Sequence, residues 1–393
     1  MVVKLISACG ARMALKGLHV VELAGLAPAP FCGMILAEFG ATVVRIDKVS
    51  DGNVFDCIAN GKKSVAIDIT HPKGAAIFRH LCKTADVLVE PYRKGVMEKL
   101  GLGPEILLAE NPSLIYARLT GYGQSGTYCE KAGHDLNYVA MSGLLPFLGR
   151  KNEKPTPPLN LLADFGGGGL MCALGIVMAL LERSKSGKGQ VIDASMVEGA
   201  AYLGSWIFRS QHLPFWGNSR GENLLDTGVH FYEVYETKDG KYMAVGAIES
   251  KFYDELIKGL GLSSEECPHI GDFNEAKLIF QEKFLQKTQK EWVKIFDSLD
   301  ACVTPVLSLE DVVTHPHNAS RKAFISPADS QVPVPSPAPR LLRTPAISLA
   351  SQPQPKHGQH TVEILQSLNY SSDEIMSLHK NGIVKCDMGR SRI

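Results

Sequence analysis

Alternating strand and helix patterns in the first third of the chain restrict its fold more than any other feature. The strand patterns cover residues 18–23, 42–47, 64–69, 85–90 and 114–119, and helix patterns cover residues 31–39, 72–83 and 104–110. Strands that alternate with helices in this way predict a parallel sheet with right-handed crossover connections. We therefore predict an α/β fold.

The turn after the first predicted strand lacks the usual dinucleotide fingerprint. Residues 24–30 read A-G-L-A-P-A-P rather than G-x-G-x-x-G, which argues against a standard NAD site. A P-loop is excluded, because Gly187-Lys188 is followed by glycine and Gly61-Lys62 by lysine, where the motif requires serine or threonine.

Composition excludes several other classes of protein. The formal net charge of the 393 residues is +0, so nothing indicates bulk affinity for nucleic acid or an anionic membrane. Nine dispersed cysteines without a C-x-x-C pair indicate reduced thiols in an intracellular compartment, and they predict neither structural zinc nor disulfides. The longest apolar run, residues 170–181, is shorter than the ~20 residues of a membrane span and predicts a buried helix, with no membrane anchor.

Two candidate proton-transfer groups lie in the glycine-rich stretch from residue 118 to residue 181. His134 stands between Gly133 and Asp135, and imidazole suits acid–base work near neutral pH. Asp164 follows an apolar tripeptide, and partial burial would raise the pKa of its carboxyl group. A surface histidine and a helix N-cap aspartate are the structural alternatives. An N-cap at position 164 would also leave backbone N–H groups free to bind an oxyanion.

Further charged residues lie outside this stretch. Glu249 occupies a strand-to-helix junction, where a helix-start carboxylate is the simpler interpretation. Basic residues gather at or just after the carboxyl ends of the predicted strands, the edge at which open α/β sheets bind ligands. As a group they predict a phosphorylated ligand, and they are Arg45, Lys48, Lys62, Lys63, Arg93 and Lys94.

The chain divides into five predicted parts. Residues 1–12 are basic and free of acids, so they form either an extension or a mitochondrial targeting segment. The remaining parts are a large domain (13–208), a crossing linker (209–228), a small αβ domain (229–330), and a proline-rich strap with two C-terminal helices that return to the large domain (331–393).

Taken together, these motifs resemble the family III CoA-transferase superfamily and, within it, the alpha-methylacyl-CoA racemases. The matching segments are residues 13–18, 26–32, 90–98, 121–126, 133–135, 161–169 and 187–194. The resemblance implies a Rossmann-like large domain, a smaller αβ domain and an interlocked homodimer in which each chain threads the other. It also implies that coenzyme A, as part of the substrate, supplies the phosphates.

The resemblance assigns roles to particular residues. The predicted CoA-binding residues are Arg45, Lys48, Ile67, Asp68, Ile69, Thr70, Arg93, Gly133, Leu136, Asn137 and Tyr138. The acid–base pair is His134 and Asp164, supported by Asp135 and by Glu249, the latter acting from either subunit. One group removes the α-proton of a 2-methylacyl-CoA and the other reprotonates the opposite face of the enolate. No metal or redox cofactor is required for this chemistry.

Two other functions remain open at this stage. In a CoA-transferase, Asp164 would be a nucleophile that forms an acyl anhydride. A non-catalytic acyl-CoA-binding protein would share the fold and bind acyl-CoA without catalysing a reaction. The racemase assignment predicts a role in branched-chain fatty acid and bile acid intermediate metabolism, in the mitochondrion, the peroxisome or both. The last residues, 388–393, do not end in an S-K-L-like signal.

Overall fold

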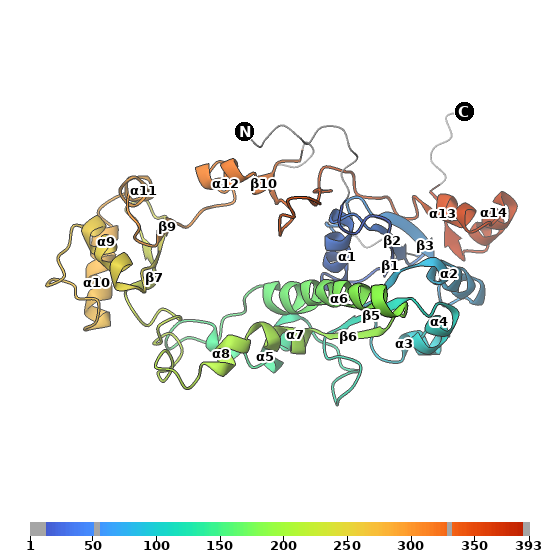
Figure 1. The fold of residues 1–393 in the computed structure, drawn as a ribbon, viewed down its shortest axis with the longest axis horizontal. Coiled ribbons are helices and arrows are strands. Elements are labelled where there is room, and N and C mark those ends of the chain that lie inside the picture. Colours follow the sequence, from blue (N-terminus) through green and yellow to red (C-terminus); the bar gives the residue numbers. More distant parts are fainter. Residues whose placement is uncertain (1–12, 51–55, 328–331, 388–393) are drawn as a thin grey trace. The chain divides into compact units, whose positions relative to one another are not determined.

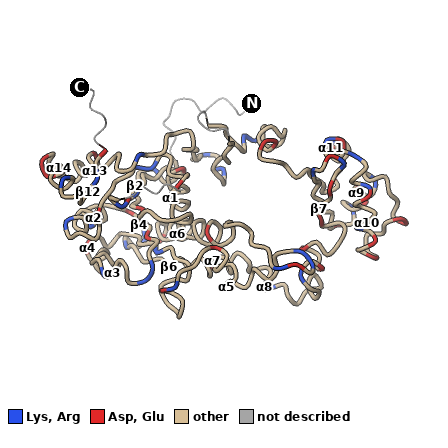
Figure 2. The backbone as a smooth tube through the Cα atoms, turned by 180° about the vertical axis from the view of Figure 1, so that it is seen from behind, with Lys and Arg blue, Asp and Glu red and all other residues tan. Residues whose placement is uncertain are grey.

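The computed structural model describes residues 13–50, 56–327 and 332–387, which pack as two compact units (Figure 1). Unit 1 comprises the described residues within 1–142, 159–203 and 322–393, and unit 2 comprises residues 143–158 and 204–321. The predicted targeting segment and the C-terminal tail 388–393 lie outside the described residues. Lysine, arginine, aspartate and glutamate are distributed through both units (Figure 2), in keeping with the net charge of +0.

Unit 1 is built on one sheet with the strand order β12-β3-β2-β1-β4-β5-β6. All neighbouring strands are parallel except β12, which runs antiparallel to β3. The strands are β1 (His19–Leu23), β2 (Thr42–Asp47), β3 (Lys63–Ile67), β4 (Val87–Glu90), β5 (Ile115–Thr120), β6 (Val191–Ser195) and β12 (Val384–Lys385). The order 3-2-1-4-5-6 is that of the doubly wound fold, which confirms the α/β prediction and its Rossmann-like character.

Helices cover both faces of this sheet because alternate strand residues point to opposite sides. Val21 and Leu23 belong to one apolar cluster with α2, α4, α13 and α14, whereas α1 and α6 pack on the other face. The helices of unit 1 are α1 (Pro28–Glu38), α2 (Pro72–Thr84), α3 (Val96–Lys99), α4 (Pro104–Glu110), α5 (Asp135–Met141), the π-helix η2 (Leu161–Leu170), α6 (Met171–Ser186), α7 (Met196–Leu203), α13 (Thr361–Ser367) and α14 (Ser372–Lys380).

The glycine run after Asp164 allows helices to approach closely. A Cβ atom on Gly167 would lie 2.4 Å from the backbone nitrogen of Ala200, and one on Gly199 would lie 1.9 Å from the carbonyl oxygen of Gly167. Contacts shorter than 3.0 Å with backbone cannot be relieved by turning a side chain. The glycines therefore let η2 cross α7 with backbone against backbone.

We expect Gly199→Ala to destabilise unit 1 by about 3 kcal/mol, because the added methyl group collides with backbone. The matched control is Gly175→Ala on α6, where the nearest atom would lie 3.5 Å from the new Cβ. Removing a helical glycine there should be neutral or stabilising by up to about 1 kcal/mol. Urea unfolding of the two variants compares them, and equal stability would contradict this account of the glycine run.

The helical run from Leu161 to Ser186 has one apolar side that unit 1 does not cover. It is long and apolar enough to cross a membrane by length and composition, a test that core helices of soluble proteins also pass. One side packs on β5 and β6 (Figure 1), but apolar side chains at helical spacing stay exposed on the other. They are Leu170, Leu174, Val177, Met178 and Leu181. The expectation of a buried helix is therefore wrong for this side, which we call the α6 stripe.

The proline-rich segment returns the chain to unit 1. It follows β10 (Phe324–Ile325) and contains β11 (Val334–Pro335), which pairs with β10. Beyond β11, the backbone N–H of Ile347 donates to the carbonyl oxygen of Glu38 at the end of α1. Farther along, α13 and α14 join the core of unit 1, and β12 adds an edge strand.

Unit 2 contains a smaller antiparallel sheet with the order β7-β8-β9. Its elements are η1 (Leu145–Phe147), α8 (Ser205–Arg209), β7 (Tyr232–Glu236), β8 (Tyr242–Gly246), α9 (Ser250–Leu260), α10 (Phe273–Phe284), α11 (Gln289–Phe296), β9 (Val303–Pro305) and α12 (Pro316–Arg321). An aromatic core that includes Phe280, Phe284 and Trp292 joins α9, α10 and α11 to the sheet.

The boundaries of the units differ from the predicted ones. The division falls after residues 203 and 321, rather than at 208 and 330, and it assigns residues 209–228 to unit 2. Residues 209–228 fold upon themselves, since the backbone N–H of Gly221 donates to Asp226 and the side-chain amide of Asn223 donates to both Ser219 and Asp226.

Candidate active site

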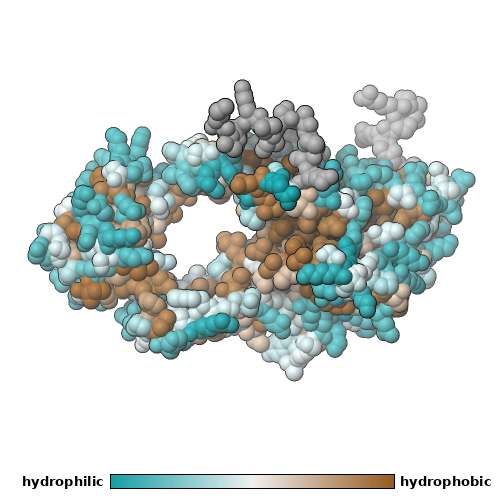
Figure 3. Space-filling view, viewed as in Figure 1, coloured by the Kyte–Doolittle hydropathy of each residue, from teal (hydrophilic) through white to brown (hydrophobic). Residues whose placement is uncertain are grey.

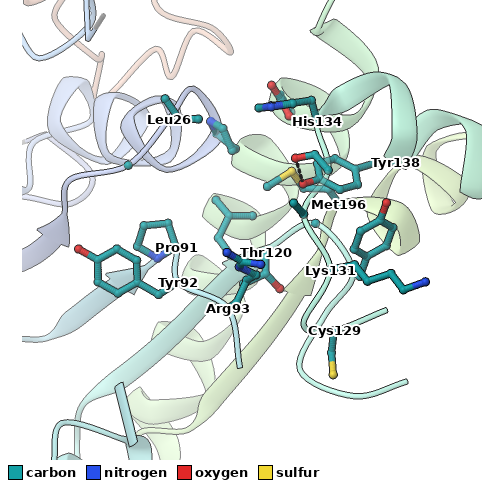
Figure 4. Close-up of a pocket in the computed structure, with 18 residues that line it drawn as sticks. Leu26, Pro91, Tyr92, Arg93, Thr120, Cys129, Lys131, His134, Tyr138 and Met196 are labelled. Carbon is teal, nitrogen blue, oxygen red and sulfur yellow. Dashed lines mark hydrogen bonds between the residues drawn. The ribbon is translucent and has the colours of Figure 1, made fainter. Parts of the chain in front are cut away.

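A pocket of about 410 Å³ opens at the carboxyl ends of the parallel strands in unit 1. The loops after β1 and β4 supply Leu26, Pro91 and Tyr92 to one side, and Tyr138 and Lys131 lie across from them (Figure 4). The chain order of the strands reverses between β1 and β4, the position at which open α/β sheets bind ligands. We call this cavity the catalytic pocket, because His134 and Asp164 both line it.

Two glycines bring the ring of Tyr138 against the loop that precedes His134. A Cβ atom on Gly121 would lie 2.2 Å from that ring, and one on Gly133 would lie 2.7 Å from it. The Tyr138 hydroxyl donates to the carbonyl oxygen of Gly133, a bond that Figure 4 draws as a dashed line. Tyr122 packs edge-on against Tyr138 with ring centroids 5.1 Å apart. These contacts hold the peptide that leads into His134.

His134 is exposed and is the N-cap residue of α5. Its backbone N–H donates to the side-chain oxygen of Asn137 at 3.1 Å, which closes the first turn of the helix. The next residue, Asp135, is buried, and its Oδ2 accepts from the backbone N–H groups of Ala163 and Asp164 at 2.8 Å each. Asp135 therefore supports the site by fixing the start of η2 beside α5.

The pKa of the Asp164 carboxyl group is raised to about 6. Burial is the main cause, and the negative charge of Asp135 adds to it. A hydrogen bond with Asn160 and the charge of His134 oppose the rise in the pKa. A carboxyl group with this pKa can both give and take a proton near neutral pH.

The prediction that Asp164 is an N-cap is wrong. Helix η2 begins at Leu161 with Asn160 as its N-cap, so Asp164 lies inside the helix. The backbone N–H of Phe165 donates to the carbonyl oxygen of Asn160, and the following glycines are interior to the helix. The peptide N–H groups after Asp164 are thus not free to bind an enolate oxygen, which corrects that part of the hypothesis.

Two of the predicted basic groups are buried and paired with carboxylates. Arg45 is 4% exposed, and its guanidinium donates to Asp47 and Asp56 at 2.9 to 3.0 Å. Lys62 is buried against Glu22. A buried cation needs an anionic partner to offset the cost of its desolvation, and these carboxylates are the partners. In this structure the Arg45 guanidinium is held by two carboxylates, and its predicted contact with coenzyme A stays a prediction.

The other predicted CoA-binding residues lie near two neighbouring cavities. Lys48 and the segment from Ile67 to Thr70 line a pocket of about 640 Å³ in unit 1, which we call the rim pocket. Tyr92 lines both the rim pocket and the catalytic pocket, so the two adjoin. Arg93 lines the catalytic pocket and donates to the carbonyl oxygen of Glu130, while Lys94 is exposed.

The remaining predicted site residues differ in where they lie. Gly133 and Tyr138 line the catalytic pocket, whereas Leu136 and Asn137 are exposed on α5 and do not line it. Glu249 is the N-cap residue of α9 in unit 2, so its predicted supporting role stays a prediction.

Sequence reasoning also missed several residues that line the catalytic pocket, among them Leu26, Tyr122 and Met196. The only available signal was position, since Leu26 follows the first strand and Met196 follows the last strand of the parallel set.

Comparison with known proteins agrees with this geometry. Residues 15–361 match the CoA-transferase family III domain. The chain belongs to this family. It is 55% identical to the alpha-methylacyl-CoA racemase of Mus musculus over 379 residues, covering 95% of this chain and 98% of that protein. The Homo sapiens racemase is also 55% identical, over 376 residues and with the same coverage.

Solved structures of family III members share the fold of this chain. A CAIB/BAIF family protein from Brucella suis superimposes with a TM-score of 0.75 at 25% identity, covering 91% of this chain and 100% of that one. The resemblance on which the sequence interpretation rested is thereby confirmed.

Proposed function

We propose that this chain is an isomerase that interconverts the (2R) and (2S) epimers of 2-methylacyl-CoA thioesters. The observation that carries the proposal is the placement of His134 and Asp164 on one pocket, with the pKa of Asp164 raised to about 6. The identity of 55% to two alpha-methylacyl-CoA racemases supports the same reaction. The pathways it serves are then branched-chain fatty acid and bile acid intermediate metabolism, in mitochondria, peroxisomes or both.

The two groups act on opposite faces of the α-carbon. Starting from one epimer, neutral His134 removes the α-proton and protonated Asp164 delivers a proton to the other face of the enolate. Starting from the other epimer, the Asp164 carboxylate is the base and the His134 imidazolium is the acid. The pair carries one proton in total, so each turnover leaves it ready for the reverse reaction. No metal or redox cofactor is needed.

The raised pKa of Asp164 predicts how the reaction depends on pH. For the epimer that Asp164 deprotonates, the carboxylate is the active form, and it is lost as the pH falls through about 6. We expect kcat/KM for this epimer to fall about tenfold per pH unit below that value. Initial rates measured from each pure epimer between pH 4.5 and 8 test this, and a profile that stays flat down to pH 4.5 would contradict the assigned base.

The direct test of the function follows optical purity. Loss of optical purity from a single 2-methylacyl-CoA epimer, with the thioester intact, supports racemisation. Transfer of CoA to a free carboxylic acid without loss of optical purity would instead support a CoA-transferase with Asp164 as nucleophile. The histidine beside Asp164 favours the first outcome, because anhydride chemistry needs no second base.

The rim pocket is our candidate for the adenosine and phosphate end of coenzyme A. Lys48 is exposed at this pocket and can pair with a phosphate group. Tyr92 borders both cavities, so a ligand seated in the rim pocket could extend its pantetheine arm past Tyr92 toward His134 and Asp164.

We also propose an interlocked homodimer. The α6 stripe presents apolar residues at positions i, i+4, i+7, i+8 and i+11, the spacing of one continuous face of a helix. An exposed apolar face of this kind is typical of a protein interface. In such a dimer Glu249 of unit 2 could approach the catalytic pocket of either subunit. Sedimentation of Val177→Glu, a change at the centre of the stripe, should show monomers where the parent chain forms dimers.

A further inference from the structure

A third cavity, of about 640 Å³, lies in unit 1 between α1, η2 and the proline-rich strap. Its volume lies within the range of small-molecule sites, and we call it the strap pocket. Strap residues from Ser348 to Gln354 form one wall, and Val334 and Pro335 of β11 add to it. Figure 3 shows apolar side chains gathered over the region of α1 and α6 in unit 1. The acid–base chemistry proposed above does not use this cavity.

The same two helices line the strap pocket and the catalytic pocket. On η2, Asp164 lines the catalytic pocket, while Leu161 and Phe165, three residues before it and one after, line the strap pocket. On α1, Pro28 lines the catalytic pocket and Met34 lines the strap pocket. Six residues of helix correspond to a rise of about 9 Å. The two cavities therefore border the same pair of packed helices, close enough for one extended acyl chain to reach both.

The interior of the strap pocket suits an alkyl chain. Phe31 and Phe165 meet edge-to-face with ring centroids 5.0 Å apart and form an apolar floor. Leu161 is 60% exposed, which leaves apolar area on the path from Asp164 without a partner within unit 1.

Polar groups at the edge of the strap pocket bond to one another. The backbone N–H of Leu349 donates to Glu38, and the side chain of Asn60 donates to the carbonyl oxygen of Gln352. These bonds hold the strap against α1 and the loop before β3, so the cavity has a fixed wall.

We propose that the strap pocket binds the distal part of the acyl chain of the CoA thioester. The proposal rests on the racemase function and extends it to substrate selection. The strap thereby becomes a specificity-determining segment: its distance from α1 sets how long and how bulky a chain the enzyme accepts. Burial of one methylene contributes about 0.8 kcal/mol, so each methylene that enters the pocket lowers KM by up to about fourfold.

The test measures KM for a series of straight 2-methylacyl-CoA thioesters of increasing length. In the parent enzyme log KM should fall with chain length until the pocket is full. Ala350→Trp narrows the cavity from the strap, and Met34→Trp narrows it from α1. Each should flatten this slope and raise the ratio of long-chain to short-chain KM by up to about sixteenfold, the effect of excluding about two methylenes. The matched control is Leu342→Trp, at a strap position that is 91% exposed and does not line the pocket.

Because one variant lies on each wall of the pocket, the other variant still gives a result if one of the two folds poorly. A slope that stays as steep in the folded pocket variants as in the parent and in Leu342→Trp overturns the proposal. So does a pocket variant that shifts the dimer–monomer equilibrium with no change in the slope, because the cavity would then belong to a contact with a second copy. Failure of the racemase function is distinguishable, because the parent enzyme would then racemise no chain length.

Discussion

Replacing Asp164 by asparagine is expected to lower the rate of inversion about a thousandfold in both directions, the usual scale of general acid–base catalysis. Asparagine keeps the shape of the side chain, and the backbone N–H of residue 164 can still donate to Asp135. The fold should therefore persist while the carboxyl proton donor and acceptor is lost. His134 remains as a base, so one epimer should still exchange its α-proton with solvent and keep its configuration.

The measurement for Asp164→Asn is α-deuterium incorporation and optical purity from each pure epimer in heavy water. Exposed Asp254 provides the control Asp254→Asn, which removes a carboxylate on α9 and should leave both readouts unchanged. Retained inversion in Asp164→Asn would exclude Asp164 as one of the two bases. A stable acyl-enzyme adduct in the parent chain at this residue would favour the nucleophile of a CoA-transferase instead.

Replacing His134 by asparagine is expected to have a mirror-image effect. His134 is the N-cap of α5, and asparagine is among the best N-cap residues, so the helix should begin at the same place. Inversion should again fall about a thousandfold, with solvent exchange retained only from the epimer that Asp164 deprotonates. The two variants should thus exchange opposite epimers.

The control for His134→Asn is His317→Asn, which changes an exposed histidine on α12. Chiral separation of the thioesters and mass spectrometry of each fraction give the result. If His134→Asn and Asp164→Asn exchange the same epimer, the assignment of one base to each face is contradicted.

Most of the parallel sheet could be predicted from the sequence because strands β1 to β5 are largely buried on both faces. Strands β1 to β5 give short runs of valine, isoleucine and leucine between glycine- and proline-containing turns, a local signal. The edge strand β12 gave no such signal, since it is two residues long and joins the sheet across more than 300 residues of chain.

The site was predicted only in part. The glycines beside His134 and Asp164 indicate an unusual backbone conformation or a close approach of another segment, but the sequence alone could not say which. The glycines after Asp164 proved to serve the crossing of η2 and α7, and the helix begins before Asp164 instead of at it. Lys62 was predicted to belong to a phosphate-binding group because its acidic partner Glu22 is 40 positions away in the sequence and is recognisable only in three dimensions.

The most direct test of the two-base mechanism is the isotope content of the inverted product at low conversion. Each pure epimer is incubated with the parent enzyme in heavy water and stopped before a tenth has reacted. The mechanism predicts that the inverted product carries deuterium at the α-carbon in both directions, because its new proton comes from the second, solvent-equilibrated base. Inverted product that retains the protium of the substrate would contradict it, since a single base would then have returned the same proton to the opposite face.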